Sequence, residues 1–197
     1  MTDHPSNIPE LSWLTETSEQ DDSWYGPGPA LVNLHSWMQR LFDTDHRCVV
    51  TATYAAASVS LPHWESWFES SPEFAIESIV DGQPPTVQLA AVSNWLNAPT
   101  SEYKNQAFET VDHTKQLHWF HEEYEDSWFD YPGMWSVEAS DFCVLSLTGD
   151  PYSPASIVDL AIISVMCAIN SFRNSIDDDI RDPAIVVLNA IRAALEK

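Results

Sequence analysis

Apolar residues recur at intervals of three and four positions along much of this chain, and this spacing restricts its fold more than any other feature. Residues 31–42 carry such a run, and residues 157–172 are apolar nearly all round, which predicts a central buried helix. The first run places five side chains on one helix face: Leu31, Leu34, Met38, Leu41 and Phe42. No convincing strand alternation or hairpin lies between the helical segments, so the sequence predicts an all-α protein.

Proline and small polar residues indicate where other helices begin and end. Residues 48–59 are small and apolar, which suits a tightly packed helix ended by Pro62, although the β-branched residues there also suit a strand. Ser71 and Pro72 are expected to be the N-cap and first residue of the next helix.

Further helices are expected over residues 86–98, 101–128 and 136–147. The second of these is the longest candidate, and the third has a β-prone second half. A last helix is capped by Asp182–Pro183, and four of its residues are expected to face the core: Ile185, Leu188, Ile191 and Leu195.

Together these segments predict a single-domain bundle of seven to nine helices over residues 30–197. Residues 1–29 are expected to form a partly extended N-terminal arm, because they hold six acidic residues, four prolines and no Lys or Arg.

The charge of the chain limits the partners that it can bind. Thirty acidic residues face eight basic ones, which gives a formal charge of −22. Residues 48–103 and 116–172 contain no Lys or Arg at all. Binding to phosphates of nucleic acid or to an anionic membrane needs basic clusters, so both are disfavoured. A basic protein partner remains possible, as do a cation, or solubility in an acidic or salt-adapted proteome.

Two acidic segments are the candidate contact surfaces for a basic partner. In the first, glutamates recur every fourth residue, a spacing at which like charges repel on a helix. In the second, four acids follow two histidines, and tryptophans near both segments are candidate anchors. The predicted partner-binding residues are Glu65, Glu69, Glu73, Glu77, Glu122, Glu123, Glu125, Asp126, Trp64, Trp67 and Trp128.

His118, His121 and Glu122 offer a different interpretation of the second segment, as a metal site on one helix face. Their order differs from that of HExxH, in which the glutamate lies between the histidines, and the chain contains no ExxH pair. The aromatic residues between them form a stripe typical of a core-facing helix side. A helix with an acidic outer face is therefore the preferred interpretation, and no cofactor is expected.

Catalytic signatures are missing from the sequence. It contains no GxSxG, Walker-type or GxGxxG motif, and it has only five glycines with which to build a phosphate-binding loop. The three cysteines, Cys48, Cys143 and Cys167, lie in apolar segments, as expected for reduced, buried thiols. The N-terminal residues lack the features of a signal peptide, and residues 160–172 are too few to span a bilayer. We therefore expect a cytoplasmic protein that is not an enzyme.

Three consecutive segments are similar in layout to small, all-helical immunity proteins of bacterial polymorphic-toxin systems. They read VQLAAVSNWLNAPTSEYKNQAFETVDHTKQ, PGMWSVEASDFCVLSLTG and PASIVDLAIISVMCAINSF, and lie within residues 86–172. The resemblance concerns helix order, a Trp-Leu pair at Trp95–Leu96 and the placement of small residues; this chain has fewer Ala and more Trp and acidic residues. It implies a protein that binds and blocks a basic toxin without catalysis of its own.

The expected function is therefore an acidic protein-binding module that occludes a basic partner, as an inhibitor or immunity protein. Two alternatives remain open. One is a metal-dependent enzyme or metal-binding protein that uses the histidine segment. The other is a structural subunit of a larger assembly, in which the arm at residues 1–29 would dock.

Overall fold

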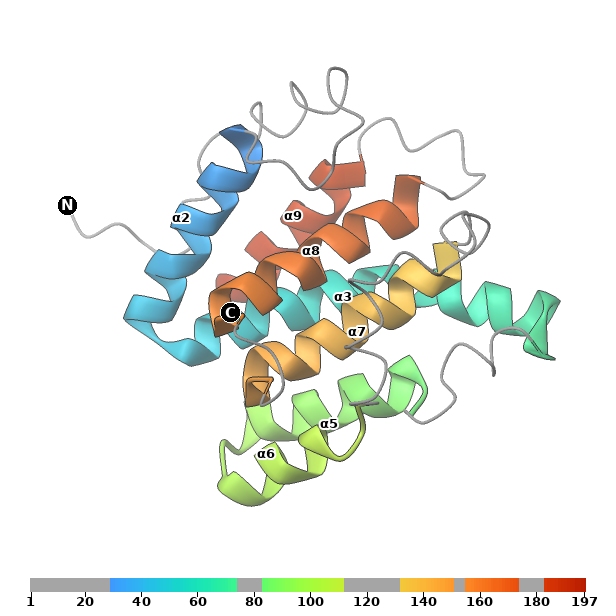
Figure 1. Cartoon of the computed structure of the whole chain (residues 1–197), viewed down its shortest axis with the longest axis horizontal. Helices are drawn as coiled ribbons and strands as arrows, with labels where there is room; N and C mark the ends of the chain where they lie inside the picture. The colour runs from blue at the N-terminus through green and yellow to red at the C-terminus, as the bar shows by residue number, and fades with distance from the viewer. Residues whose placement is uncertain (1–28, 74–82, 112–131, 151–154, 174–182) are drawn as a thin grey trace.

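Seven helices make up the part of the chain that the computed structural model describes, which is residues 29–73, 83–111, 132–150, 155–173 and 183–197 (Figure 1). No strand occurs within these ranges. The all-α prediction is confirmed. The helices are α2 (Pro29–Thr44), α3 (His46–Ser70), α5 (Pro85–Asn97), α6 (Ser101–Phe108), α7 (Pro132–Thr148), α8 (Ile157–Arg173) and α9 (Pro183–Leu195).

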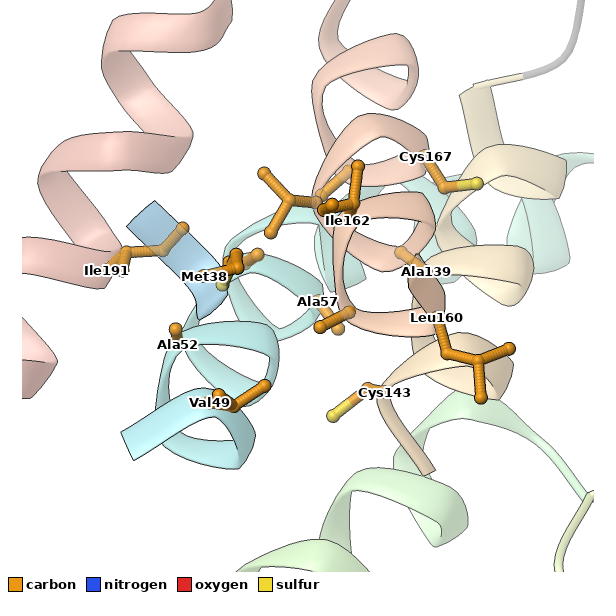
Figure 2. Close-up of a cluster of buried hydrophobic side chains, with 14 of the residues drawn as sticks. Met38, Val49, Ala52, Ala57, Ala139, Cys143, Leu160, Ile162, Cys167 and Ile191 are labelled. Carbon is orange, nitrogen blue, oxygen red and sulfur yellow. The ribbon is translucent and has the colours of Figure 1, made fainter. Parts of the chain in front are cut away.

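Helices α3, α7 and α8 form the centre of the bundle, since each packs against the other two. On one side α2 contacts α3 and α8, and α9 contacts α3 and α8. On the other side α5 and α6 pack against α7, as Figure 1 shows below α7. The main core lies between these elements and draws on all seven helices; Figure 2 shows part of it, with Met38, Val49, Ile162 and Ile191 converging from α2, α3, α8 and α9.

Helix α7 is the most completely enclosed element. Thirteen of its 17 residues are buried, against 11 of 17 in α8. The helix predicted to be central, α8, is therefore one of two deeply buried helices. The β-prone second half is helical, and Val144, Leu145 and Leu147 are fully buried there. Contacts with α3, α5 and α8 outweigh the weak strand preference of these residues.

Hydroxyl groups join the three central helices where small side chains let them approach closely. Thr53 Oγ1 on α3 lies 2.9 Å from Ser146 Oγ on α7, and Ser136 Oγ donates to the carbonyl of Ser60 at 3.0 Å. Ser164 Oγ on α8 donates to the carbonyl of Ala139 at 2.7 Å. These hydrogen bonds satisfy polar groups that would otherwise be costly to bury.

The prediction that Pro62 ends a helix is wrong, because α3 continues through it to Ser70. Pro62 is exposed, so its ring meets solvent rather than the core. Beyond it, Trp64 and Trp67 pack against Val137 of α7, and this contact compensates for the backbone hydrogen bond that proline cannot make. The helix ends where the Ser71–Pro72 signal indicates a break, with the Ser71 N–H donating to the carbonyl of Trp67 at 2.8 Å.

The prediction of one long helix over residues 101–128 is also wrong. Helix α6 ends at Phe108, and a turn over residues 109–111 follows. The carbonyl of Thr110 accepts hydrogen bonds from the Gln83 N–H at 2.9 Å and from Gln88 Nε2 at 3.3 Å. This carbonyl is thus bonded to α5 and the residues just before it rather than to a continuing helix. Residues 112–131 lie outside the described ranges.

The inward face of α9 is close to the one predicted, with one correction. Leu188 and Ile191 are buried, whereas Ile185 is 38% exposed. The buried side chains of α9 are Ala184, Val187, Leu188 and Ile191. They follow the i, i+3, i+4, i+7 pattern of a helix face, and Ile185 falls about 100° away from Ala184 around the axis.

Candidate interaction site

The C-terminal third of α3 carries two of the predicted partner-binding acids, and a third follows it. Glu65 and Glu69 are exposed on this helix, and Glu73 is exposed just after the helix ends. In Figure 1 this end of α3 projects to the right of the other labelled helices. Glu65, Phe68 and Glu69 stand at i, i+3 and i+4, so they share one face of the helix.

The position of these acids along α3 is electrostatically unfavourable. Glu69 lies in the last turn of a 25-residue helix, and that turn contains no basic residue. The C-terminus of a helix is the negative end of its dipole, where acids destabilise and bases stabilise. Glu65 and Glu69 are also like charges at i and i+4. Neither forms an ion pair with any residue in the described ranges.

Trp64 and Trp67 face the interior of the molecule. They are only 6% and 7% exposed and form a small second core cluster with Val137, against which Leu61 and Met134 pack. Their apolar area is thus already in contact with the chain itself, and their predicted role as partner anchors stays a prediction.

Phe68 is the surface residue that sequence reasoning missed. Its side chain is 37% exposed, and its ring stacks on Trp64 with centroids 5.1 Å apart and an angle of 25° between the planes. The signal was present in the spacing, because Phe68 follows Trp64 by four residues and lies beside Glu69. The site therefore combines two carboxylates with an aromatic ring that is held in place by its stacking on Trp64.

Gly133 explains how closely α7 approaches this part of α3. A Cβ atom added at Gly133 would lie 2.6 Å from the Cβ of Trp67, closer than side chains tolerate. The missing side chain thus allows the start of α7 to lie against the second core cluster. The orientation of the α3 end relative to the bundle depends on this contact.

The other predicted site residues lie outside the described ranges. They are Glu77, Glu122, Glu123, Glu125, Asp126, Trp128, His118 and His121. Their partner-binding role, and the alternative metal site, stay predictions. Within the described ranges, no three His, Cys, Asp or Glu side chains are grouped so as to hold a metal ion.

Two of the described histidines, His46 and His63, make hydrogen bonds between helices. His63 Nδ1 lies 2.6 Å from Ser171 Oγ, and that hydroxyl donates to the carbonyl of Pro132 at 2.8 Å. The tautomer of His63 sets which group donates in this pair, and the same hydroxyl also links α8 to the backbone at the start of α7. His46 Nε2 donates to the carbonyl of Ser146 at 2.7 Å.

The three thiols are poor nucleophiles at neutral pH. Burial raises the pKa of Cys143 to about 12. Burial, and then the nearby carboxyls of Glu138 and Asp141, raises the pKa of Cys167 well above its usual range. Partial burial also raises the pKa of Cys48. A protonated thiol does not attack an electrophile, so none of the three is suited to catalysis.

A buried polar cluster joins α5 to α7. Gln88 is 1% exposed, and it donates through Nε2 to Asp141 Oδ1 while accepting through Oε1 from the Ser140 hydroxyl. Glu138, one turn earlier on α7, is 2% exposed. The sequence analysis did not identify this cluster, since it treated residues 136–147 only as a helix; its signal was two acids at i and i+3 in an apolar segment.

An open pocket lies between α6 and the end of α7, with a volume of ≈ 450 Å³. Its walls are formed by Lys104, Asn105, Phe108, Thr148, Gly149 and Asp150. One base and one acid on opposite elements do not make a catalytic group, and the pocket contains no His or Cys.

Comparison of the sequence with protein-family models and with curated proteins gives no match, and comparison with solved structures gives none. No helix within the described ranges is both long and apolar enough to cross a membrane.

Proposed function

We propose that this protein binds a basic partner protein through the exposed acidic end of α3 and occludes it, as an inhibitor or immunity protein acting in the cytoplasm. The observation that carries the proposal is the placement of Glu65 and Glu69. Both are exposed, and neither forms an ion pair with a described residue. Glu69 lies in the last turn of α3, where negative charge is disfavoured, and Glu65 lies one turn earlier as a like charge at i−4.

Residues that violate a local stability rule, without a compensating contact in the folded chain, are frequently functional. A basic surface docked on this end would supply the missing compensation, since carboxylates and Lys or Arg side chains would pair as water is excluded. The charge of −22 would also speed the approach of such a partner at low salt. The three free cysteines fit the reducing environment of the cytoplasm.

Co-expression tests the proposal in cells. The gene immediately upstream is expressed alone and with this chain, and survival is scored. We expect the neighbour to kill and this chain to rescue. A double charge reversal, Glu65→Lys with Glu69→Lys, should abolish rescue, whereas Glu102→Lys on the exposed side of α6 should not.

The purified pair gives the electrostatic test. The dissociation constant should rise steeply between low and molar salt, because exposed charges are screened. A harmless neighbour removes the immunity role, and a complex whose affinity is indifferent to salt removes the charge mechanism.

A further inference from the structure

We infer that the end of α3 recognises an arginine side chain of the partner, whose guanidinium stacks on Phe68 beside Glu65 and Glu69. This inference rests on the proposed function and narrows it, because it names the group that the surface reads. It predicts a preference for arginine over lysine, which a purely electrostatic surface lacks.

The first step in the argument is the spacing of the three side chains. Residues three or four apart are neighbours on a helix, with Cβ atoms about 5–6 Å apart. Glu65 is therefore a neighbour of both Phe68 and Glu69, and all three are exposed. A cation that covers the ring lies within reach of both carboxylates.

The second step is the fixed position of the ring. Phe68 is stacked on Trp64 at 5.1 Å with nearly parallel planes, and Trp64 is 6% exposed within the second core cluster. One face of the Phe68 ring is thereby occupied, and the exposed remainder of the side chain meets solvent. An aromatic ring that is held in this way loses little rotamer freedom when a ligand covers it.

The third step distinguishes arginine from lysine. A guanidinium is planar, is more weakly hydrated than an ammonium and stacks on aromatic faces. Its five N–H groups can pair with the carboxylates of Glu65 and Glu69 while its plane covers the ring. A lysine ammonium can also lie over an aromatic ring, but it is more strongly hydrated and has no planar face, so it gains less from the contact.

The fourth step is that no base within the described ranges competes for these two carboxylates. Residues 48–103 contain no Lys or Arg, and neither Glu65 nor Glu69 forms an ion pair with a described residue. The negative end of the α3 dipole adds to the attraction for a cation at this point.

Peptide titration of the full-length chain tests the inference. Two capped hexapeptides of equal charge are used, acetyl-Gly-Arg-Gly-Gly-Arg-Gly-amide and its lysine counterpart, and the backbone amide shifts of residues 64–69 are followed by NMR. We expect the arginine peptide to bind about two- to fivefold tighter, a factor of the size of one exposed cation–π contact, because the planar guanidinium stacks and is more weakly hydrated than the ammonium.

Variants assign the preference to the ring. Phe68→Leu keeps an apolar side chain but removes the aromatic face, so both peptides should then bind equally. Phe68→Tyr keeps the ring and should retain the preference, which guards against a leucine variant that folds poorly. Glu65→Gln with Glu69→Gln should weaken both peptides, and Glu102→Gln should weaken neither.

The outcomes separate the inference from the proposed function. If the two peptides bind equally and Phe68→Leu changes nothing, while the double glutamine variant weakens both, the arginine site is refuted and the acidic surface stands. If neither peptide shifts residues 64–69, both the arginine site and the acidic surface are refuted.

Discussion

Replacing Glu69 by glutamine should make the free protein more stable and its complex weaker. Two terms contribute to the gain. Removing a negative charge from the last turn of α3 relieves an unfavourable interaction with the helix dipole, worth about 0.3–1 kcal/mol. Removing the repulsion from Glu65 at i−4 adds about 0.2–0.5 kcal/mol. Because both side chains are exposed, we expect a total of about 0.5–1 kcal/mol.

Urea or thermal unfolding of the two proteins at low salt measures this gain. For a chain of this size, 1 kcal/mol shifts Tm by about 2–4 °C, so the expected increase is about 1–4 °C. The increase should shrink at molar salt, where the Debye length is about 3 Å.

Glu102→Gln is the matched control. Glu102 is also exposed, but it lies in the first turn of α6, where the helix dipole favours an acid. Its replacement should therefore cost a few tenths of a kcal/mol. The reasoning is refuted if Glu69→Gln lowers the stability, or if its effect is the same at low and at molar salt.

Three further predictions concern the rest of the fold. Gly133→Ala should cost about 1–3 kcal/mol in urea unfolding, because the added methyl group overlaps Trp67. Thr53→Val should cost about 1 kcal/mol in the same assay, since it removes the hydroxyl that meets Ser146 in the core. Partial burial opposes ionisation of Asp159, but hydrogen bonds from the N-cap serine of α8 and a neighbouring histidine lower its pKa overall. Its contribution to stability is therefore present above about pH 4 and is lost as the pH falls through the lowered pKa. Asp159→Asn should lower Tm near neutral pH and match the parent in strong acid; a constant difference at all pH values would refute this.

The helices whose apolar residues follow a clear 3.6-residue period were the ones that the sequence predicted best. Leu34, Met38 and Leu41 are buried as expected, and residues 160–172 lie within α8. Boundaries that depend on tertiary contacts were not predictable. Whether Pro62 ends a helix depends on what Trp64 and Trp67 find to pack against, and that surface comes from α7, some seventy residues later.

The site was predictable in part, for the same reason. The four-residue spacing of Glu65 and Glu69 predicted a shared helix face, and the structure exposes both. Which aromatic residues meet solvent could not be deduced from composition, because Trp64, Trp67 and Phe68 lie within one turn or so and only their packing distinguishes them. Gln88 looked like an ordinary helix residue until α7 placed Asp141 against it.

The two hydroxyl contacts between α3 and α7 have a consequence for how the acidic end is presented. Thr53 contacts Ser146, and Ser60 contacts Ser136. The residue number rises along α3 while it falls along α7, so the two helices are antiparallel and are joined at two points. Sliding α3 by one turn, about 5.4 Å, would break both pairs at once. The two pairs therefore fix the axial register of α3 against α7, and with it how far the last turns of α3 extend from the bundle. Whatever docks there meets charges whose height above the surface is fixed before contact.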